Sequence, residues 1–104
     1  MSANVLSLAD IQNHVTQVAR FYDVKKVSLF GSYANGNQTP ESDIDLLVEF
    51  AEKPKEPITL FTIIGLQQDI EELTGKEVDI VEYPLEKDSF LEINKEVLLY
   101  AEKR

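Results

Sequence analysis

The sequence predicts a small α/β (α+β) fold, a mixed β-sheet with helices packed on one face. Apolar residues recur at helical spacing in segments 8–22 and 60–73, and again near the end of the chain. Between these helical segments lie three strand-like segments, 25–30, 43–50 and 76–82. The expected order is αβαβαβα with one very short helix, in a single domain of residues 1–104.

The first helix is expected to begin after Ser7, because Ser7 followed by Asp10 resembles an N-cap with an acidic first turn. Its apolar positions recur at helical spacing and predict a core-facing stripe: Ile11, Val15, Val18 and Tyr22. The strand 25–30 follows. Residues 32–35 then predict a short helical turn that ends at Gly36, before a polar loop.

The segment 43–50 alternates clearly between apolar and polar residues and predicts a strand with two different faces. One face is apolar and is expected to lie in the core: Ile44, Leu46, Val48 and Phe50. The opposite face is expected to form the working surface: Asp43, Asp45, Leu47 and Glu49.

Residues 51–57 combine four charged residues with two prolines and predict a linker or protruding loop. Thr59 can cap the helix 60–73, which Gly75 would end. After the strand 76–82, Ser89 and Glu92 form a capping-box pattern. The apolar positions that follow predict a last helix running toward the end of the chain: Ile93, Val97, Leu98 and Ala101.

Composition excludes several classes of function. The 104 residues contain no cysteine, which removes disulfides, thiolate catalysis and cysteine-ligated zinc. The net charge of −9 and the presence of only two arginines, Arg20 and Arg104, argue against binding to duplex nucleic acid. No apolar run reaches the length of a membrane span and no secretory pattern opens the chain, so we expect a cytoplasmic protein without membrane contact.

Two aspartates at the start of the strand 43–50 predict a metal site. Asp43 and Asp45 point to the same face, with Cα atoms about 6.6 Å apart, so both carboxylates can approach one divalent cation. Asp79 interrupts the apolar strand 76–82, where a charge is unfavourable unless it is paired or bound to metal. If the two strands are neighbours, three carboxylates gather on one face. Oxygen ligands of this kind favour Mg²⁺ or Mn²⁺.

The turn at Gly31 and Ser32 predicts a phosphate site beside these carboxylates. Glycine permits close approach of the backbone, and the amides that begin the next helical turn can point toward an anion. The Ser32 hydroxyl can donate a hydrogen bond to a phosphate oxygen. A Gly-Ser pair alone indicates an ordinary turn, but its combination with three aspartates indicates phosphoryl-transfer chemistry.

Gly31-Ser32, ten further residues, and Asp43-x-Asp45 together resemble the signature of the DNA polymerase β-like nucleotidyltransferase superfamily. The segments 29–34 and 42–48 are similar to its minimal nucleotidyltransferases, and the resemblance spans nearly the whole chain. It implies the polymerase β-like nucleotidyltransferase fold. It also implies that three aspartates bind the metal and act in catalysis: Asp43, Asp45 and Asp79.

The same resemblance implies ATP as the nucleotide donor and places four residues in the nucleotide site: Gly31, Ser32, Asn35 and Ser42. At Asn35 the family commonly has arginine, which holds phosphate with charge and two hydrogen bonds. We therefore expect activity that depends strongly on metal, with weak affinity for free nucleotide.

Minimal nucleotidyltransferases of this kind resemble the antitoxins of toxin–antitoxin pairs whose toxin is a HEPN-domain ribonuclease. The resemblance implies that this chain transfers AMP from ATP to a hydroxyl, a tyrosine, of such a toxin, as the antitoxin of a type VII-like pair. Either a hetero-oligomer with that toxin or a homodimer would be consistent with so small a chain.

Two alternatives differ in class. A non-catalytic antitoxin would neutralise its partner by binding alone, with Asp43 and Asp45 structural or residual; the acidic surface and Asn35 favour this reading. A nucleotidyltransferase acting on a small molecule would need a pocket that 104 residues can scarcely build without dimerisation.

Overall fold

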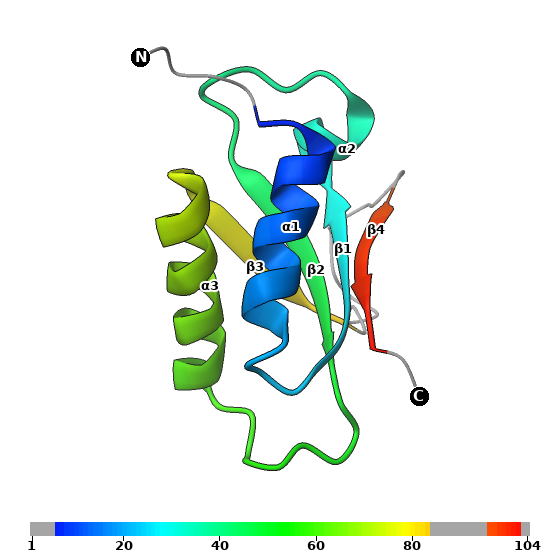
Figure 1. The fold of residues 1–104 in the computed structure, drawn as a ribbon, viewed down its shortest axis with the longest axis vertical. Helices are drawn as coiled ribbons and strands as arrows, with labels where there is room; N and C mark the ends of the chain where they lie inside the picture. The colour runs from blue at the N-terminus through cyan, green and yellow to red at the C-terminus, as the bar shows by residue number, and fades with distance from the viewer. Residues whose placement is uncertain (1–5, 84–95, 103–104) are drawn as a thin grey trace, which may run out of the picture.

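The computed structural model describes residues 6–83 and 96–102 and contains a four-stranded sheet covered by helices (Figure 1). The strand order is β3-β2-β1-β4. The strands are β1 (Val24–Phe30), β2 (Ile44–Phe50), β3 (Val78–Glu82) and β4 (Val97–Ala101). β1 is antiparallel to both β2 and β4, whereas β2 and β3 are parallel, so the predicted mixed sheet is confirmed.

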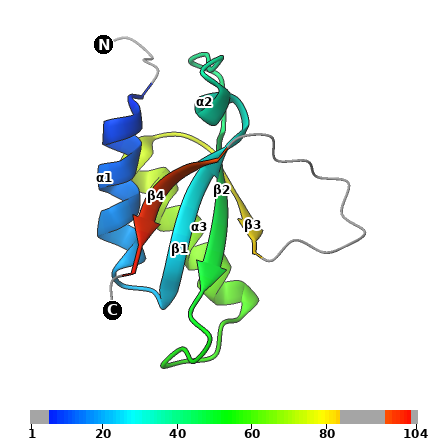
Figure 2. The same ribbon diagram turned by 90° about the vertical axis from the view of Figure 1, so that its right-hand side faces the viewer.

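Two long helices, α1 (Leu8–Ala19) and α3 (Leu60–Thr74), lie side by side over one face of this sheet (Figure 1). The short helix α2 (Gly31–Asn35) lies beyond the end of β1 (Figure 2). Helices on one face are what the sequence predicted. None of the helices in the described part of the chain combines the length and apolar character that crossing a bilayer requires.

The helix ends follow the predicted capping residues. The Ser7 hydroxyl accepts a hydrogen bond from Asp10 N, and Thr59 and Thr62 form a reciprocal capping box at the start of α3. Gly75 ends α3 in the left-handed conformation. α1 ends three residues before the predicted boundary, and Tyr22 lies beyond it, packed against the core.

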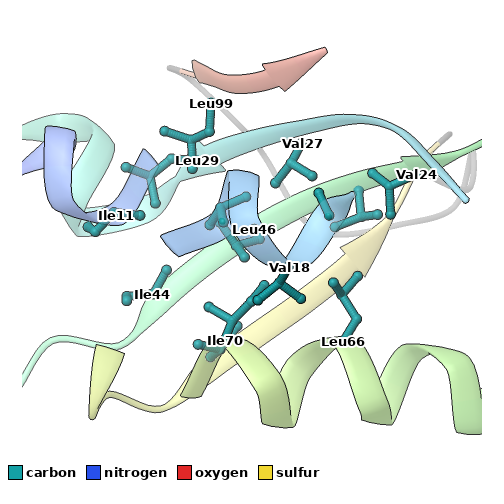
Figure 3. Packing of buried hydrophobic residues seen from close by; sticks show 14 of the residues in the cluster. Ile11, Val18, Val24, Val27, Leu29, Ile44, Leu46, Leu66, Ile70 and Leu99 are labelled. Carbon is teal, nitrogen blue, oxygen red and sulfur yellow. The ribbon is translucent and has the colours of Figure 1, made fainter. Parts of the chain in front are cut away.

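The core lies between the helices and the sheet (Figure 3). Ile11, Val15 and Val18 of α1 face Leu66 and Ile70 of α3 and the buried side chains of the strands. On β2 the apolar set points into this core as predicted: Ile44, Leu46 and Val48 are each 0% exposed. Leu47, predicted on the working surface, is also buried, at 5% exposure.

The predicted last helix is wrong where the structure describes it. Val97–Ala101 forms β4, which pairs with β1 through the register Lys26↔Ala101 and Leu29↔Val97, with an irregularity between Val27 and Ser28. The capping-box residues Ser89 and Glu92, and Ile93, lie outside the described residues. The apolar run 97–101 is compatible with both helical and strand periodicity. It forms a strand because the free edge of β1 supplies hydrogen-bond partners for its backbone.

Candidate active site

Parallel pairing of β2 and β3 brings two of the predicted catalytic residues together. In the register of this pair, Ile44 lies opposite Val78 and Asp45 lies opposite Asp79. Ile44 and Val78 are buried in the core, so the next residue on each strand points to the other face. The expectation that the two strands are neighbours is therefore confirmed, and both carboxylates project from the same face of adjacent strands.

Asp43 and Asp79 act electrostatically on Asp45. The pKa of the half-buried Asp45 carboxyl is raised, first by burial and then by the negative charges of Asp79 and Asp43. Asp79 is exposed, while Asp43 is half-buried immediately before β2. A cluster of this kind concentrates negative charge at one end of the sheet, where a cation would relieve the repulsion.

Gly31 brings the beginning of α2 against this cluster. Its φ is +75°, and a Cβ at this position would lie 3.1 Å from Asp45 Cγ and collide with Asp45 Oδ2. Glycine is required here for both reasons, the left-handed backbone and the missing Cβ. The turn predicted to hold phosphate therefore lies directly against Asp45, one of the predicted metal ligands.

The rest of α2 is held by its own buried side chains and hydrogen bonds. Tyr33 and Ala34 are buried, Ser32 is half-buried, and Gly36 ends the helix with φ +78°. Asn35 Nδ2 donates a hydrogen bond of 3.0 Å to Gly31 O. The Asn35 side chain thus stabilises the turn itself, and no cationic side chain belongs to α2.

Ser42, the remaining predicted nucleotide-site residue, organises the loop between α2 and β2. Its hydroxyl accepts a 2.8 Å hydrogen bond from Thr39 N, and Ser42 N donates to Thr39 O at 3.0 Å. These bonds close a turn directly before Asp43. Ser42 therefore has a structural part in placing Asp43, whatever else it contacts.

Two of the cavities lined by described residues differ in how near they lie to the carboxylates. One of about 480 Å³ borders Asp79 between α3 and β3, and is lined by Gln67, Glu71, Gly75, Lys76, Glu77, Val78 and Asp79. A second, of about 550 Å³, lies in the groove between α1 and α3 and contains none of the predicted site residues. The first cavity borders the aspartate cluster only at Asp79, and neither cavity contains Asp43, Asp45 or Gly31. We therefore place the candidate active site at the aspartates beside Gly31, on the sheet face opposite the core.

The last turn of α3 and its connection to β3 contribute residues that the sequence did not point to. Glu71 Oε2 accepts a 2.9 Å hydrogen bond from Val78 N, and Lys76 Nζ donates to Pro40 O in the loop before Asp43. Both contacts join residues that are adjacent only after folding. No local pattern around Glu71 or Lys76 signals them.

The donor set fits a divalent cation whose coordination is shared with a ligand. Within residues 6–83 and 96–102, no three acidic or histidine side chains are arranged so that they alone could hold a metal ion. The raised pKa of Asp45 nevertheless reflects, after burial, the repulsion of two further carboxylates, Asp79 and Asp43. Mg²⁺ commonly takes one or two carboxylates together with water and substrate phosphates, and this cluster suits such a site.

The chain belongs to the nucleotidyltransferase domain family, whose model matches residues 11–103. A candidate protein adenylyltransferase of Methanocaldococcus jannaschii is 37% identical over 97 residues, which cover 89% of this chain and 100% of that protein. The domain that carries Gly31-Ser32 and the aspartate cluster is thus a nucleotidyltransferase domain, as the resemblance implied.

Solved structures share the fold. A toxin–antitoxin structure with AMP-PNP matches with a TM-score of 0.70 and 21% identity, over 88% of this chain and 74% of that chain. A structure of a tri-AMPylated Shewanella oneidensis HEPN toxin in complex with MNT antitoxin matches with a TM-score of 0.62 and 18% identity, over 91% of this chain and 73% of that chain. At these identities the similarity is one of fold.

Proposed function

We propose that this chain is a Mg²⁺-dependent adenylyltransferase that moves AMP from ATP to a tyrosine hydroxyl of a HEPN-domain toxin and thereby acts as its antitoxin. The observation that carries the proposal is the pairing of Asp45 with Asp79 across β2 and β3, directly against Gly31. The 37% identical candidate protein adenylyltransferase supports the reaction class. The toxin–antitoxin structures of the same fold support the class of partner.

Each site residue has a distinct part in this reaction. Asp43, Asp45 and Asp79 would hold the metal, which when bound neutralises charge on the phosphates. The Gly31 backbone and the Ser32 hydroxyl would contact the triphosphate. Asn35 would support this turn through its bond to Gly31 O and contributes no charge to phosphate binding.

The transfer exchanges one phosphorus–oxygen bond for another. The acceptor oxygen forms a bond to the α-phosphorus of ATP, and the bond from that phosphorus to the bridging oxygen of pyrophosphate breaks. Asp79, the exposed carboxylate of the cluster, would orient the acceptor hydroxyl and accept its proton. Its exposure leaves room for a side chain supplied by another protein.

The test uses a purified HEPN-domain toxin as the acceptor. Incubated with this chain, ATP and Mg²⁺, it should gain one or more AMP masses in intact-mass spectrometry. The double variant Asp43→Ala/Asp45→Ala should transfer none. The control Glu52→Ala/Glu56→Ala removes the same charge from the 51–57 loop and should transfer normally. An unchanged acceptor mass with the wild-type chain would remove the enzymatic part of the proposal.

A second candidate is an antitoxin that acts by binding alone. Asn35 is bonded to Gly31 O, and α2 has no cationic side chain that could attract a triphosphate. Low affinity for the triphosphate would favour this second candidate. The same double variant separates the two candidates. Full neutralisation of the toxin by Asp43→Ala/Asp45→Ala would favour binding, whereas loss of neutralisation would favour transfer.

A further inference from the structure

Lys76 joins the two connections that carry the candidate site. It lies between α3 and β3, and its Nζ donates a hydrogen bond to Pro40 O in the loop between α2 and β2. A second bond joins the same segments, from Ile44 N to Glu77 O at 2.9 Å. Asp43 lies between Pro40 and Ile44, so the segment that bears Asp43 is tied at both ends to the α3–β3 connection.

That connection is itself well anchored. Thr74 Oγ1 donates to Ile70 O at 2.8 Å and accepts a bond from Lys76 N at 3.3 Å. Glu71 Oε2 accepts the 2.9 Å bond from Val78 N. These bonds fix the backbone on both sides of Lys76, so its side chain reaches Pro40 from a defined position.

The chemistry of the contact suits a positioning role. Within the described residues Lys76 forms no ion pair with a carboxylate, and its ammonium group donates an exposed hydrogen bond to a neutral carbonyl. The contact therefore leaves the carboxylates available as ligands. Among the described residues, Lys76 is also the single cationic residue lining the cavity that borders Asp79.

We propose, resting on the function proposed above, that Lys76 is a positioning residue that holds Asp43 beside Asp45 and Asp79 through the Pro40 carbonyl. It does so without contacting the nucleotide. A hydrogen bond with a charged donor exceeds a neutral one in strength, and the side-chain entropy of lysine offsets part of the gain. Loss of the contact should therefore make local opening about fivefold more frequent and metal binding about fivefold weaker.

The test compares Lys76→Met, which removes the donor, with Lys76→Arg, which keeps one. In the metal-free protein, Lys76→Met should speed amide hydrogen exchange at Ile44 about fivefold and leave core amides such as Leu66 unchanged. Mn²⁺ binding, followed by electron paramagnetic resonance, should weaken about fivefold. The kcat of AMP transfer should fall while the KM for ATP stays within twofold. Lys76→Arg should recover most of each effect.

The exposed Lys53 in the 51–57 loop provides the control, since Lys53→Met removes the same charge away from the site. The proposal would be overturned if Lys76→Met had the same Ile44 exchange rate and the same Mn²⁺ affinity as the wild type. So would a raised KM for ATP with unchanged exchange, because that result assigns Lys76 a direct phosphate contact. If the wild-type chain transfers no AMP, the proposed function fails, while exchange and Mn²⁺ binding still decide the role of Lys76.

Discussion

Replacing Asp45 by Asn should stabilise the metal-free protein, because the folded state holds this carboxylate under burial and repulsion. Asp45 lies opposite Asp79 in the β2–β3 register, and both Asp79 and Asp43 raise its pKa. No hydrogen bond contributes to that pKa, so the amide loses little that the carboxylate had. Carboxylates gathered in this way repel one another when no cation lies between them.

The magnitude follows from Coulomb's law. Adjacent strands lie about 4.8 Å apart, and two unit charges about 5 Å apart repel by about 0.8 kcal/mol in water and about 3 kcal/mol at an effective dielectric constant of about 20. The exposure of Asp79 places the pair near the weaker limit because solvent screens it. We therefore expect Asp45→Asn to raise the free energy of unfolding by about 1 kcal/mol at pH 7. In a domain of this size that corresponds to about 4 °C in Tm.

Urea unfolding at pH 7 with a chelator measures this difference. Folding raises the pKa of Asp45, so the wild type loses stability as pH rises from the unfolded value of about 3.9 through the raised folded value. The gap between variant and wild type should thus vanish near pH 3. Added Mg²⁺ should narrow the gap at pH 7 by stabilising only the wild type.

The control Glu56→Gln removes one negative charge from an exposed loop residue and should leave stability within about 0.5 kcal/mol. A metal-free Asp45→Asn protein that is equal to or less stable than the wild type at pH 7 would refute the electrostatic reasoning. A gain matched by Glu56→Gln would assign the effect to the net charge of −9 instead of the cluster.

Three further predictions concern single side chains. Gly31→Ala should lower the free energy of unfolding by more than Gly36→Ala does. The Gly36 variant carries only about 1 kcal/mol of left-handed backbone strain, because its added Cβ meets no neighbour within 4 Å. Urea titrations of both variants measure the difference, and equal losses would show that the contact with Asp45 contributes nothing. Burial and the 2.7 Å bond to Asp69 raise the pKa of Tyr22 to about 12, so wild-type stability should fall between pH 10 and pH 12, as the unfolded chain releases this proton first. Tyr22→Phe should show a shallower fall in the same unfolding series, and parallel curves would contradict the assignment. Asn35→Arg should lower the KM for ATP in the AMP-transfer assay by adding a charged phosphate contact, although it forfeits the bond to Gly31 O; an unchanged or higher KM would count against this.

Local signals predicted most of the fold. Ser7 and Thr59 cap their helices as expected, and β2 buries its apolar set because alternation over seven residues allows only one register against a core. The last segment failed because Val97–Ala101 is apolar throughout, so its pattern does not distinguish a helix from a strand. Pairing with β1, distant in sequence, decides the outcome.

The sequence by itself determined the chemistry available to this protein: the Gly-Ser turn, the paired aspartates and a third aspartate within an apolar strand. Only the tertiary structure decided that β3 lies parallel to β2, which sets Asp79 beside Asp45, and that Lys76 reaches Pro40. Side-chain periodicity is encoded over a few neighbouring residues. Strand order and contacts between connections depend on chain segments separated by more than thirty residues, which meet only when the core assembles.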